Sequence, residues 1–247
     1  MEECMIYVTG DCHGDWSRFS MKNFPMQKEM SRNDYVIVCG DFGIWDNSNA
    51  ENYWLNWLSE KSFTLLFIDG NHENFNLLNK FEEVDFCGGR AHKIRDNIYH
   101  LMRGYIFTIE DKRFFCMGGA VSQDIRDGVL SGKPIRELRK EAQRARQYGK
   151  LVRIKDIEWW EEEVPSAEEM ERGLSNLSGN QVDYILTHCA PSSIAALLGY
   201  KPDVVTTYLE DICRNTKFTK WFIGHYHINY SMFNEFIFLY TDFIRIS

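Results

Sequence analysis

The sequence predicts an α/β fold built on mixed β-sheets, and three kinds of pattern support that prediction. Short apolar runs, most of them rich in β-branched or aromatic residues, recur along the chain and are typical of buried strands. Helix-like stretches separate several of these runs, and the order strand, helix, strand is that of layered α/β domains. Two further regions contain extended segments on either side of a short polar turn, which indicates β-hairpins and therefore antiparallel neighbours.

The predicted elements follow one another along the chain. Buried strands are predicted at residues 5–8, 35–39, 65–68, 184–186 and 221–223. Helices are predicted at residues 50–60, 74–81 and 204–213. Hairpins are predicted to pair residues 105–109 with 113–117, and residues 230–233 with 236–240.

A chain of 247 residues with 44% apolar and 15% aromatic residues can bury a large core. A single domain over residues 1–247 is therefore expected, since no repeat or linker-like stretch divides the chain.

Charge is segregated in the middle of the chain, in a segment at about 120–180 that is expected to be helical. Residues 133–155 contain nine Lys or Arg and two acids, whereas residues 156–171 contain eight acids and no base. Such blocks are typical of solvated helix faces, and Ser166 with Glu169 forms a capping-box pattern. The alternative is a basic lid over a site, where it would contribute to phosphate binding.

The overall composition restricts the partners. The net charge is -8, so the surface gives no broad attraction to nucleic acid or to an anionic membrane, and a nucleic-acid partner is not favoured. No apolar stretch approaches the ~18 residues of a membrane span, and no secretion signal precedes the first predicted strand. Seven scattered cysteines are typical of reduced thiols, so a cytoplasmic location is expected. No feature of the sequence specifies an oligomeric state.

Polar blocks follow all five predicted strands, where ligands gather in open α/β sheets. The candidate metal ligands in these blocks are Asp11, His13, Asp41, Asn71, His188, His225 and His227. Alternation along an extended segment places residues i and i+2 on one side, so Asp11 is expected to converge with His13, and His225 with His227.

Seven ligands are too many for one tetrahedral zinc but suit two metal ions that share a bridging carboxylate, for which Asp41 is expected. Imidazole, carboxylate and amide ligands together favour divalent or trivalent Mn, Fe or Zn. Two such ions would convert a bridging water into a hydroxide nucleophile and neutralise phosphoryl oxygens, which is the chemistry of phosphate-ester hydrolysis. His72, next to Asn71, is predicted to act as general acid on the leaving oxygen, with Glu73 or Asp69 either orienting its ring or serving as a cap or loop residue.

The five blocks, in this order, resemble the pattern of the calcineurin-like metallophosphoesterase superfamily, which runs Asp-x-His, Gly-Asp, Gly-Asn-His-Glu/Asp, His and Gly-His-x-His. The resemblance spans residues 5–246 and implies two mixed sheets packed as a sandwich between helices, in four α/β/β/α layers, with a dinuclear site between the sheets. It assigns His72 to the proton-donor role. It assigns one ion to Asp11, His13, Asp41 and His227, and the other to Asp41, Asn71, His188 and His225.

The Gly-Asn-His-Glu block at residues 70–73 is most similar to the protein Ser/Thr phosphatases and their bacterial and phage relatives. That branch follows its Gly-Asp with Asp-Arg-Gly, whereas residues 40–46 read Gly-Asp-Phe-Gly-Ile-Trp-Asp and contain no Arg. The loop at residues 118–122, with Arg126 beyond it, resembles a group of bacterial metallophosphoesterases of undefined substrate. Arg126 and Asn71 are accordingly predicted to contact the substrate phosphate, and the alternative for Arg126 is a surface salt bridge.

The predicted function is hydrolysis of a phosphorylated substrate. Within that class the alternatives are a Ser/Thr protein phosphatase and a nucleotide or dinucleoside polyphosphate hydrolase. A nuclease would need a basic groove with aromatic stacking surfaces, for which residues 133–155 are the only candidate. A non-catalytic metal-binding scaffold is a further alternative, although none of the expected ligands is missing from the sequence.

Overall fold

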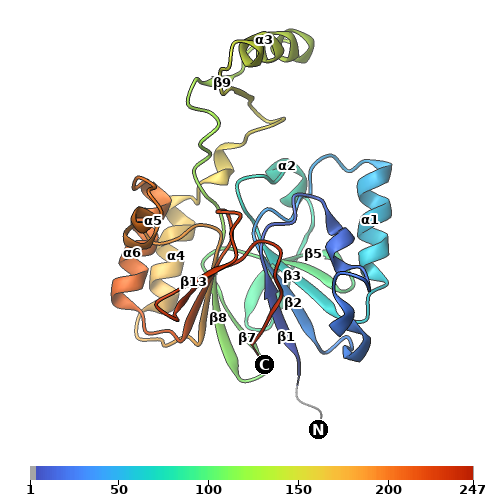
Figure 1. The fold of residues 1–247 in the computed structure, drawn as a ribbon, viewed down its shortest axis with the longest axis vertical. Coiled ribbons are helices and arrows are strands. Elements are labelled where there is room, and N and C mark those ends of the chain that lie inside the picture. Colours follow the sequence, from blue (N-terminus) through green and yellow to red (C-terminus); the bar gives the residue numbers. More distant parts are fainter. Residues whose placement is uncertain (1–3, 247) are drawn as a thin grey trace.

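The computed structural model describes residues 4–246, and most of its strands form two large mixed sheets (Figure 1). The first sheet has seven strands in the order β15-β1-β2-β3-β6-β5-β4. Its strands are β1 (Ile6–Thr9), β2 (Tyr35–Cys39), β3 (Thr64–Ile68), β4 (Glu82–Phe86), β5 (Gly89–Arg95), β6 (Ile98–Leu101) and β15 (Ile244–Arg245). Neighbours among β1, β2, β3 and β6 run parallel, whereas β15, β5 and β4 join antiparallel.

The second sheet has six strands in the order β13-β14-β12-β11-β8-β7. Its strands are β7 (Ile106–Ile109), β8 (Lys112–Met117), β11 (Tyr184–Thr187), β12 (Lys220–Ile223), β13 (Tyr230–Met232) and β14 (Phe236–Phe238). The four central strands run parallel, and the antiparallel pairs β7–β8 and β13–β14 form its two ends. Both predicted hairpins are confirmed.

The two sheets pack face to face because their strands are apolar on both sides. Along β2, Ile37 and Cys39 belong to the cluster between the sheets, which also contains Phe222 of β12. The alternate residues Val36 and Val38 belong to a second cluster on the outer face of the first sheet. The core between the two sheets therefore reaches the ends of the central strands, where the loops begin.

Helices cover both outer faces, α1 and α2 on one side and α4, α5 and α6 on the other (Figure 1). Their bounds are α1 (Asn49–Ser59), α2 (Phe75–Leu78), α4 (Ala167–Leu177), α5 (Ser192–Leu197) and α6 (Val204–Asn215). Short 3-10 helices are η1 (Trp16–Phe19), η2 (Pro25–Glu29) and η3 (Glu161–Glu163). The predicted sandwich of two mixed sheets flanked by helices is confirmed.

Local signals explain where several helices begin. Ser48 caps α1 by accepting a hydrogen bond from the N–H of Glu51. Ser166 and Glu169 form both bonds of the predicted capping box at the start of α4.

The structure contains elements that the sequence patterns do not predict, among them β4, β5, β6 and α5, and α2 is shorter than predicted. The strands β4 and β5 are rich in charged residues and contain no apolar run, and β6 and α5 are only four and six residues long. The segment at about 120–180, expected to be helical, also contains two strands of two residues each. The predicted helix at residues 74–81 ends at Leu78, because the chain enters β4 at Glu82.

One segment leaves the layers. Residues 123–159, called the arm below, contain β9 (Val129–Leu130), α3 (Ile135–Gln147) and β10 (Arg153–Ile154), and Figure 1 shows α3 and β9 projecting away from both sheets. The arm has a small core of its own, formed by Leu138, Ala142, Val152 and Ile154. Most other side chains of α3 are exposed, so this part of the basic block is a solvated face.

Within residues 4–246, no helix combines the length and the apolarity that crossing a bilayer requires. No disulfide joins the cysteines of this part of the chain.

Candidate metal centre

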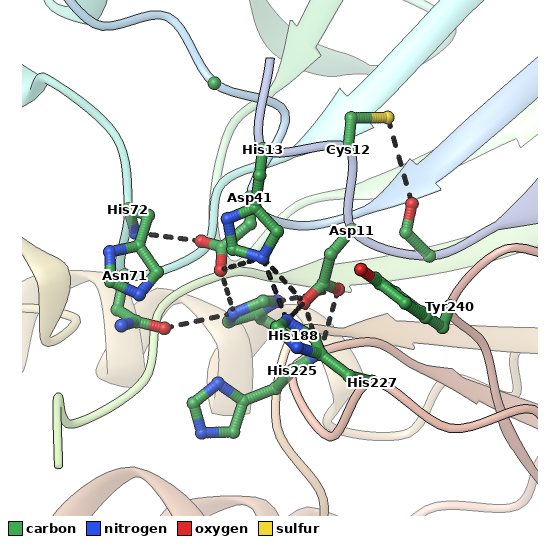
Figure 2. A network of polar contacts seen from close by, with 12 residues as sticks. Asp11, Cys12, His13, Asp41, Asn71, His72, His188, His225, His227 and Tyr240 are labelled. Atoms are coloured by element: carbon green, nitrogen blue, oxygen red, sulfur yellow. Dashed lines mark hydrogen bonds and ion pairs between the residues drawn. The ribbon is translucent and has the colours of Figure 1, made fainter. Parts of the chain in front are cut away.

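The loops that follow five strands meet in one place. These strands are β1, β2 and β3 of the first sheet and β11 and β12 of the second. Figure 2 shows side chains from all five loops gathered around the carboxylates of Asp11 and Asp41. This is the arrangement expected where parallel strands end side by side.

Asp11, His13 and His227 form one group of potential metal ligands, whose ligand atoms all lie within 4.8 Å of one another. The Nε2 atoms of His13 and His227 are 2.9 Å apart. Asp11 Oδ2 lies 3.6 Å from His13 Nε2 and 3.1 Å from His227 Nε2. Two imidazole nitrogens and a carboxylate oxygen converging in this way form a donor set suited to Zn, Mn or Fe.

Asp11, Asp41 and His188 form a second group by the same distance criterion. Asp41 Oδ2 lies 3.3 Å from His188 Nε2 and 3.6 Å from His13 Nε2, so this carboxylate reaches a histidine of each group. The amide oxygen of Asn71 lies 3.1 Å from His188 Nε2, beside the second group. Asp11 belongs to both groups, and Asp41 reaches a histidine of each. The residues present therefore fit two ions that share one of these two carboxylates.

His225 is the predicted ligand whose ring lies apart from both groups. Its backbone N–H donates to the two oxygens of Asp11 at 2.9 and 3.1 Å, and its ring packs against that of His188 with centroids 4.9 Å apart. Figure 2 shows the imidazole turned away from the two carboxylates. Burial lowers its pKa to about 4, so the ring is neutral near pH 7.

Four of these residues have a left-handed backbone conformation. Their φ angles are 48° at His13, 45° at Asp41, 65° at His225 and 51° at His227. Non-glycine residues rarely adopt this region, and those that do are enriched at functional sites. The alternation expected of extended segments therefore does not hold in these loops. His13 still joins Asp11, but His227 joins that pair without His225.

Gly40 and Gly70 leave room for the ligands. A Cβ atom on Gly40 would lie 2.0 Å from Nδ1 of His188, and one on Gly70 would lie 2.0 Å from Oδ1 of Asp41. Any side chain at either position would displace a ligand, which explains why glycine precedes the ligand in these blocks.

The two carboxylates stay ionised although Asp11 is 0% and Asp41 1% exposed. Burial raises the pKa of Asp11, but the charge of His188 and hydrogen bonds from His13 and His227 lower it to about 2. Burial also opposes ionisation of Asp41, and His188 holds the pKa of that carboxyl below its usual range. Buried charges are normally paired or bound to metals, so this negative pair fits cation binding.

A chain of hydrogen bonds orients Asn71. Its Nδ2 donates to Ser122 Oγ at 3.0 Å, and Ser122 donates to Glu163 through its Oγ at 2.6 Å and its backbone N–H at 2.9 Å. The amide oxygen of Asn71 is thereby directed at His188. The loop that contains Ser122 is marked in the sequence by its likeness to other metallophosphoesterases, but no sequence pattern points to Glu163, which lies 41 residues further on.

Glu73 and Asp69 have other partners than the ring of His72. Glu73 accepts hydrogen bonds from the loop after β2, including one of 3.1 Å from the N–H of Gly43. Asp69 pairs with Arg103, whose Nε lies 2.9 Å from Oδ2. These bonds support the loop interpretation of both residues.

His72 borders a cleft of about 380 Å³ that opens beside the ligand groups. The residues lining it are His13, Trp45, His72, Arg153, Ile157, Glu158 and Trp160. The N–H of His72 donates to Asp41 Oδ1 at 2.8 Å, and its ring centroid lies 5.5 Å from that of His13. Burial lowers the pKa of His72, Asp41 opposes this, and the charge of Arg153 lowers it further.

Arg126, predicted to contact the substrate, has a side chain that is 72% exposed and lies 3.7 Å from Asp127. The guanidinium that lines the cleft belongs to Arg153, which the sequence analysis includes only in the basic block. Arg153 Nε donates to Asp124 Oδ2 at 2.6 Å, and its Nη1 donates to the carbonyl of Glu158 at 2.8 Å.

A family model described as calcineurin-like phosphoesterase matches residues 5–229. The chain belongs to this family. Membership makes the chain a phosphoesterase, a hydrolase of phosphate ester bonds, and confirms the predicted enzyme class and superfamily. A search of curated proteins finds no matching relative. Calcineurin-like phosphoesterases generally use dinuclear metal sites, and the two ligand groups described above are candidates for such a site.

Proposed function

We propose that this calcineurin-like phosphoesterase hydrolyses its substrate at a dinuclear centre of Mn, Fe or Zn. The observation that carries the proposal is the pair of ligand groups joined by Asp11, with Asp41 between His13 and His188. One ion would be held by Asp11, His13, Asp41 and His227, and the other by Asp41, Asn71 and His188. His225 would complete the second set once its ring, which is turned away from the carboxylates, rotates toward them. When bound, such ions lower the pKa of a water molecule and neutralise phosphoryl oxygens.

His72 is proposed as the general acid. Hydrolysis adds water across the phosphorus–oxygen ester bond, and the leaving oxygen must gain a proton to depart as an alcohol. The imidazole of His72 borders the cleft beside the ligand groups, where the leaving group would lie, and an imidazolium can donate a proton near neutral pH. The water that attacks phosphorus loses a proton in exchange, so the balance is ester plus water to phosphate plus alcohol.

Asn71 and Arg126 are proposed to contact the substrate phosphate. Asn71 is held in place by Ser122, which supports a fixed amide beside the reacting phosphate. For Arg126 the support is the chemistry of its guanidinium, which can engage two phosphate oxygens at once.

The first test is metal reconstitution. The purified chain, stripped with a chelator, should be inactive and should regain hydrolysis of p-nitrophenyl phosphate or bis-p-nitrophenyl phosphate with Mn, Fe or Zn. Elemental analysis should find about two ions per chain. Activity that is unchanged by the chelator, or saturation at a single ion, would contradict the dinuclear proposal.

Three further predictions from the sequence belong to the same proposal. They are a single domain over residues 1–247, a cytoplasmic location, and closest kinship with bacterial and phage members through the Gly-Asn-His-Glu block. The substrate is proposed to be phosphorylated, with protein phosphatase and nucleotide hydrolase activities as the alternatives within the class.

A further inference from the structure

We propose that the cleft beside the metal centre binds the organic part of the substrate and selects phosphate esters whose alcohol carries a flat aromatic ring. The ring would lie on Trp45, and Arg153 of the arm would contact a phosphate oxygen. Nucleoside 5′-monophosphates and arylalkyl phosphates share this chemistry. The inference rests on the proposed phosphoesterase function and narrows its substrate class.

The position of the cleft makes it the place for a leaving group. His13, a proposed ligand, and His72, the proposed proton donor, both line the cleft. An ester whose phosphorus lies at the ligand groups and whose leaving oxygen faces His72 must extend its alcohol into the space beyond, which Trp45 and the arm enclose.

Trp45 is exposed yet fixed in place. Its backbone N–H donates to Glu51 Oε2 at 2.7 Å, and its carbonyl accepts from Asn74 Nδ2 at 2.6 Å. Its indole N–H donates to the carbonyl of His72 at 2.7 Å, and the ring packs so closely on Gly14 that a Cβ there would lie 2.9 Å from it. The residue is nevertheless 44% exposed. A rigid indole presented to a cleft can stack on a planar ring without losing side-chain entropy on binding.

A further part of the lining is apolar, formed by Ile157 of the arm and by Trp160, which follows the arm in the chain. Ile157 is 39% exposed, and Trp160 is buried. A flat ring on Trp45 that also contacts these residues would cover apolar surface, which an aliphatic polyol would not do.

The charges of the cleft fit one phosphate group. Arg153 is held by Asp124 through Nε and Nη2 and by the carbonyl of Glu158 through Nη1, so its guanidinium is fixed, and these three contacts leave two of its five N–H donors for a phosphate. Glu158 in turn is paired with Arg146 at 2.5 Å. One fixed guanidinium with its acidic partner suits a single phosphoryl group and not the repeated charges of a nucleic-acid strand.

The test compares substrates that differ only in the ring. Adenosine 5′-monophosphate and ribose 5-phosphate have the same primary alcohol as leaving group, so the ratio of their kcat/KM values isolates the contribution of the base. With the Mn-loaded full chain we expect a preference of about five- to hundredfold for the nucleotide, the range of a base stacked on an aromatic residue. Benzyl phosphate is the third substrate. A preference for benzyl phosphate alone over ribose 5-phosphate would assign the cleft to arylalkyl esters, and a preference for the nucleotide would assign it to nucleotides.

Substitutions distinguish the contribution of Trp45 from that of Arg153. Trp45→Leu should bring the ratio close to one, whereas Trp45→Phe should retain most of it, and any effect transmitted through His72 cancels in the ratio. Tyr53→Leu, at a 65% exposed aromatic residue on α1, is the matched control and should leave the ratio unchanged.

Arg153→Gln should lower kcat/KM about tenfold or more for all three substrates and weaken inhibition by inorganic phosphate, because Arg153 would contact the phosphate that these substrates share. Arg139→Gln, on the exposed part of α3, should do neither.

Two results would overturn the inference. The first is a kcat/KM ratio near one, relative to ribose 5-phosphate, for both aromatic substrates in the wild-type protein, and the second is a preference that survives Trp45→Leu. In both cases hydrolysis itself would still uphold the proposed function. If the metal-loaded chain hydrolyses none of the three esters, and neither p-nitrophenyl phosphate nor bis-p-nitrophenyl phosphate, the proposed function fails. The cleft is then judged by calorimetric binding of adenosine 5′-monophosphate against ribose 5-phosphate. Equal affinities would overturn the inference, and tighter nucleotide binding that Trp45→Leu removes would support it.

Discussion

His72 lies beside the ligand groups without belonging to either, and this position separates proton donation from metal binding. His72→Ala should lower kcat about 10²- to 10⁴-fold, the usual contribution of a general acid, and leave the metal content unchanged. His13→Ala is the matched contrast, because its Nε2 is one of the clustered ligand atoms, and it should lose metal together with activity. Steady-state kinetics and elemental analysis of the same samples check both variants. A loss of metal in His72→Ala equal to the loss of rate would make His72 a ligand or a structural residue.

Gly70 gives a second prediction at the scale of one residue. The Cβ of Gly70→Ala would collide with the carboxylate of Asp41, so that carboxylate must move away from His13 and His188. We expect loss of most bound metal, measured by elemental analysis, and destabilisation of about 1–3 kcal/mol from overpacking. Gly179→Ala is the control, because its Cβ meets nothing within 4 Å although φ is 71°. It should lose some stability and keep its metal. Retention of full metal content in Gly70→Ala would show that Asp41 tolerates displacement.

The candidate ligands could be predicted because each directly follows an apolar run and chemistry restricts the residue types. What could not be predicted are contacts that depend on loop conformation. The left-handed φ angles at His13 and His227 redirect their side chains, and no spacing rule encodes them. The bond from Ser122 to Glu163 and the approach of Arg153 to the cleft also depend on how distant segments fold back, so they required the structure.

At the scale of elements, the capping box of α4 makes a measurable contribution to stability. Ser166 accepts from the N–H of Glu169, and the Glu169 carboxylate accepts from the N–H of Ser166 at 2.7 Å. Ser166→Ala should lower the free energy of unfolding by about 1 kcal/mol in urea denaturation, because it leaves a helix N–H without its partner. Ser178→Ala, at the exposed end of the same helix, should change it by less than about 0.5 kcal/mol. Equal effects of the two substitutions would show that the cap is not what stabilises α4.

The elements that carry the site are those that the sequence predicts best. Strands β2, β3, β11 and β12 are buried on both faces, which yields continuous apolar runs. The strands β4 and β5 lie toward the edge of the first sheet, where exposed Glu82, Glu83 and Asp85 interrupt any apolar pattern. Their existence depends on pairing, β5 with β6 and β4 with β5, which propensity alone cannot indicate.

At the scale of the whole molecule, two parts of the basic block at residues 133–155 lie in different surroundings. The exposed face of α3 projects away from the sheets (Figure 1), whereas Arg153, after α3 in the chain, returns to the cleft. A solvated face and a basic lid are the two interpretations of the whole block that its sequence allows. The structure supports the solvated face for α3, whereas Arg153 lines the cleft.

Metal binding should also stabilise the whole molecule, because the ligands come from five loops of two sheets and the unfolded chain cannot gather them. Each bound ion at one hundred times its Kd would add about 2.7 kcal/mol to the free energy of unfolding. We therefore expect a chelator to lower the Tm and Mn²⁺ to restore it, as measured by scanning calorimetry. Asp41→Asn should deplete both ions together and abolish this shift, since Asp41 reaches a histidine of each group. Asp242→Asn, at an exposed carboxylate, should retain the shift. A Tm that is independent of metal in the wild-type protein, or a full metal complement in Asp41→Asn, would count against a shared carboxylate at the centre of the fold.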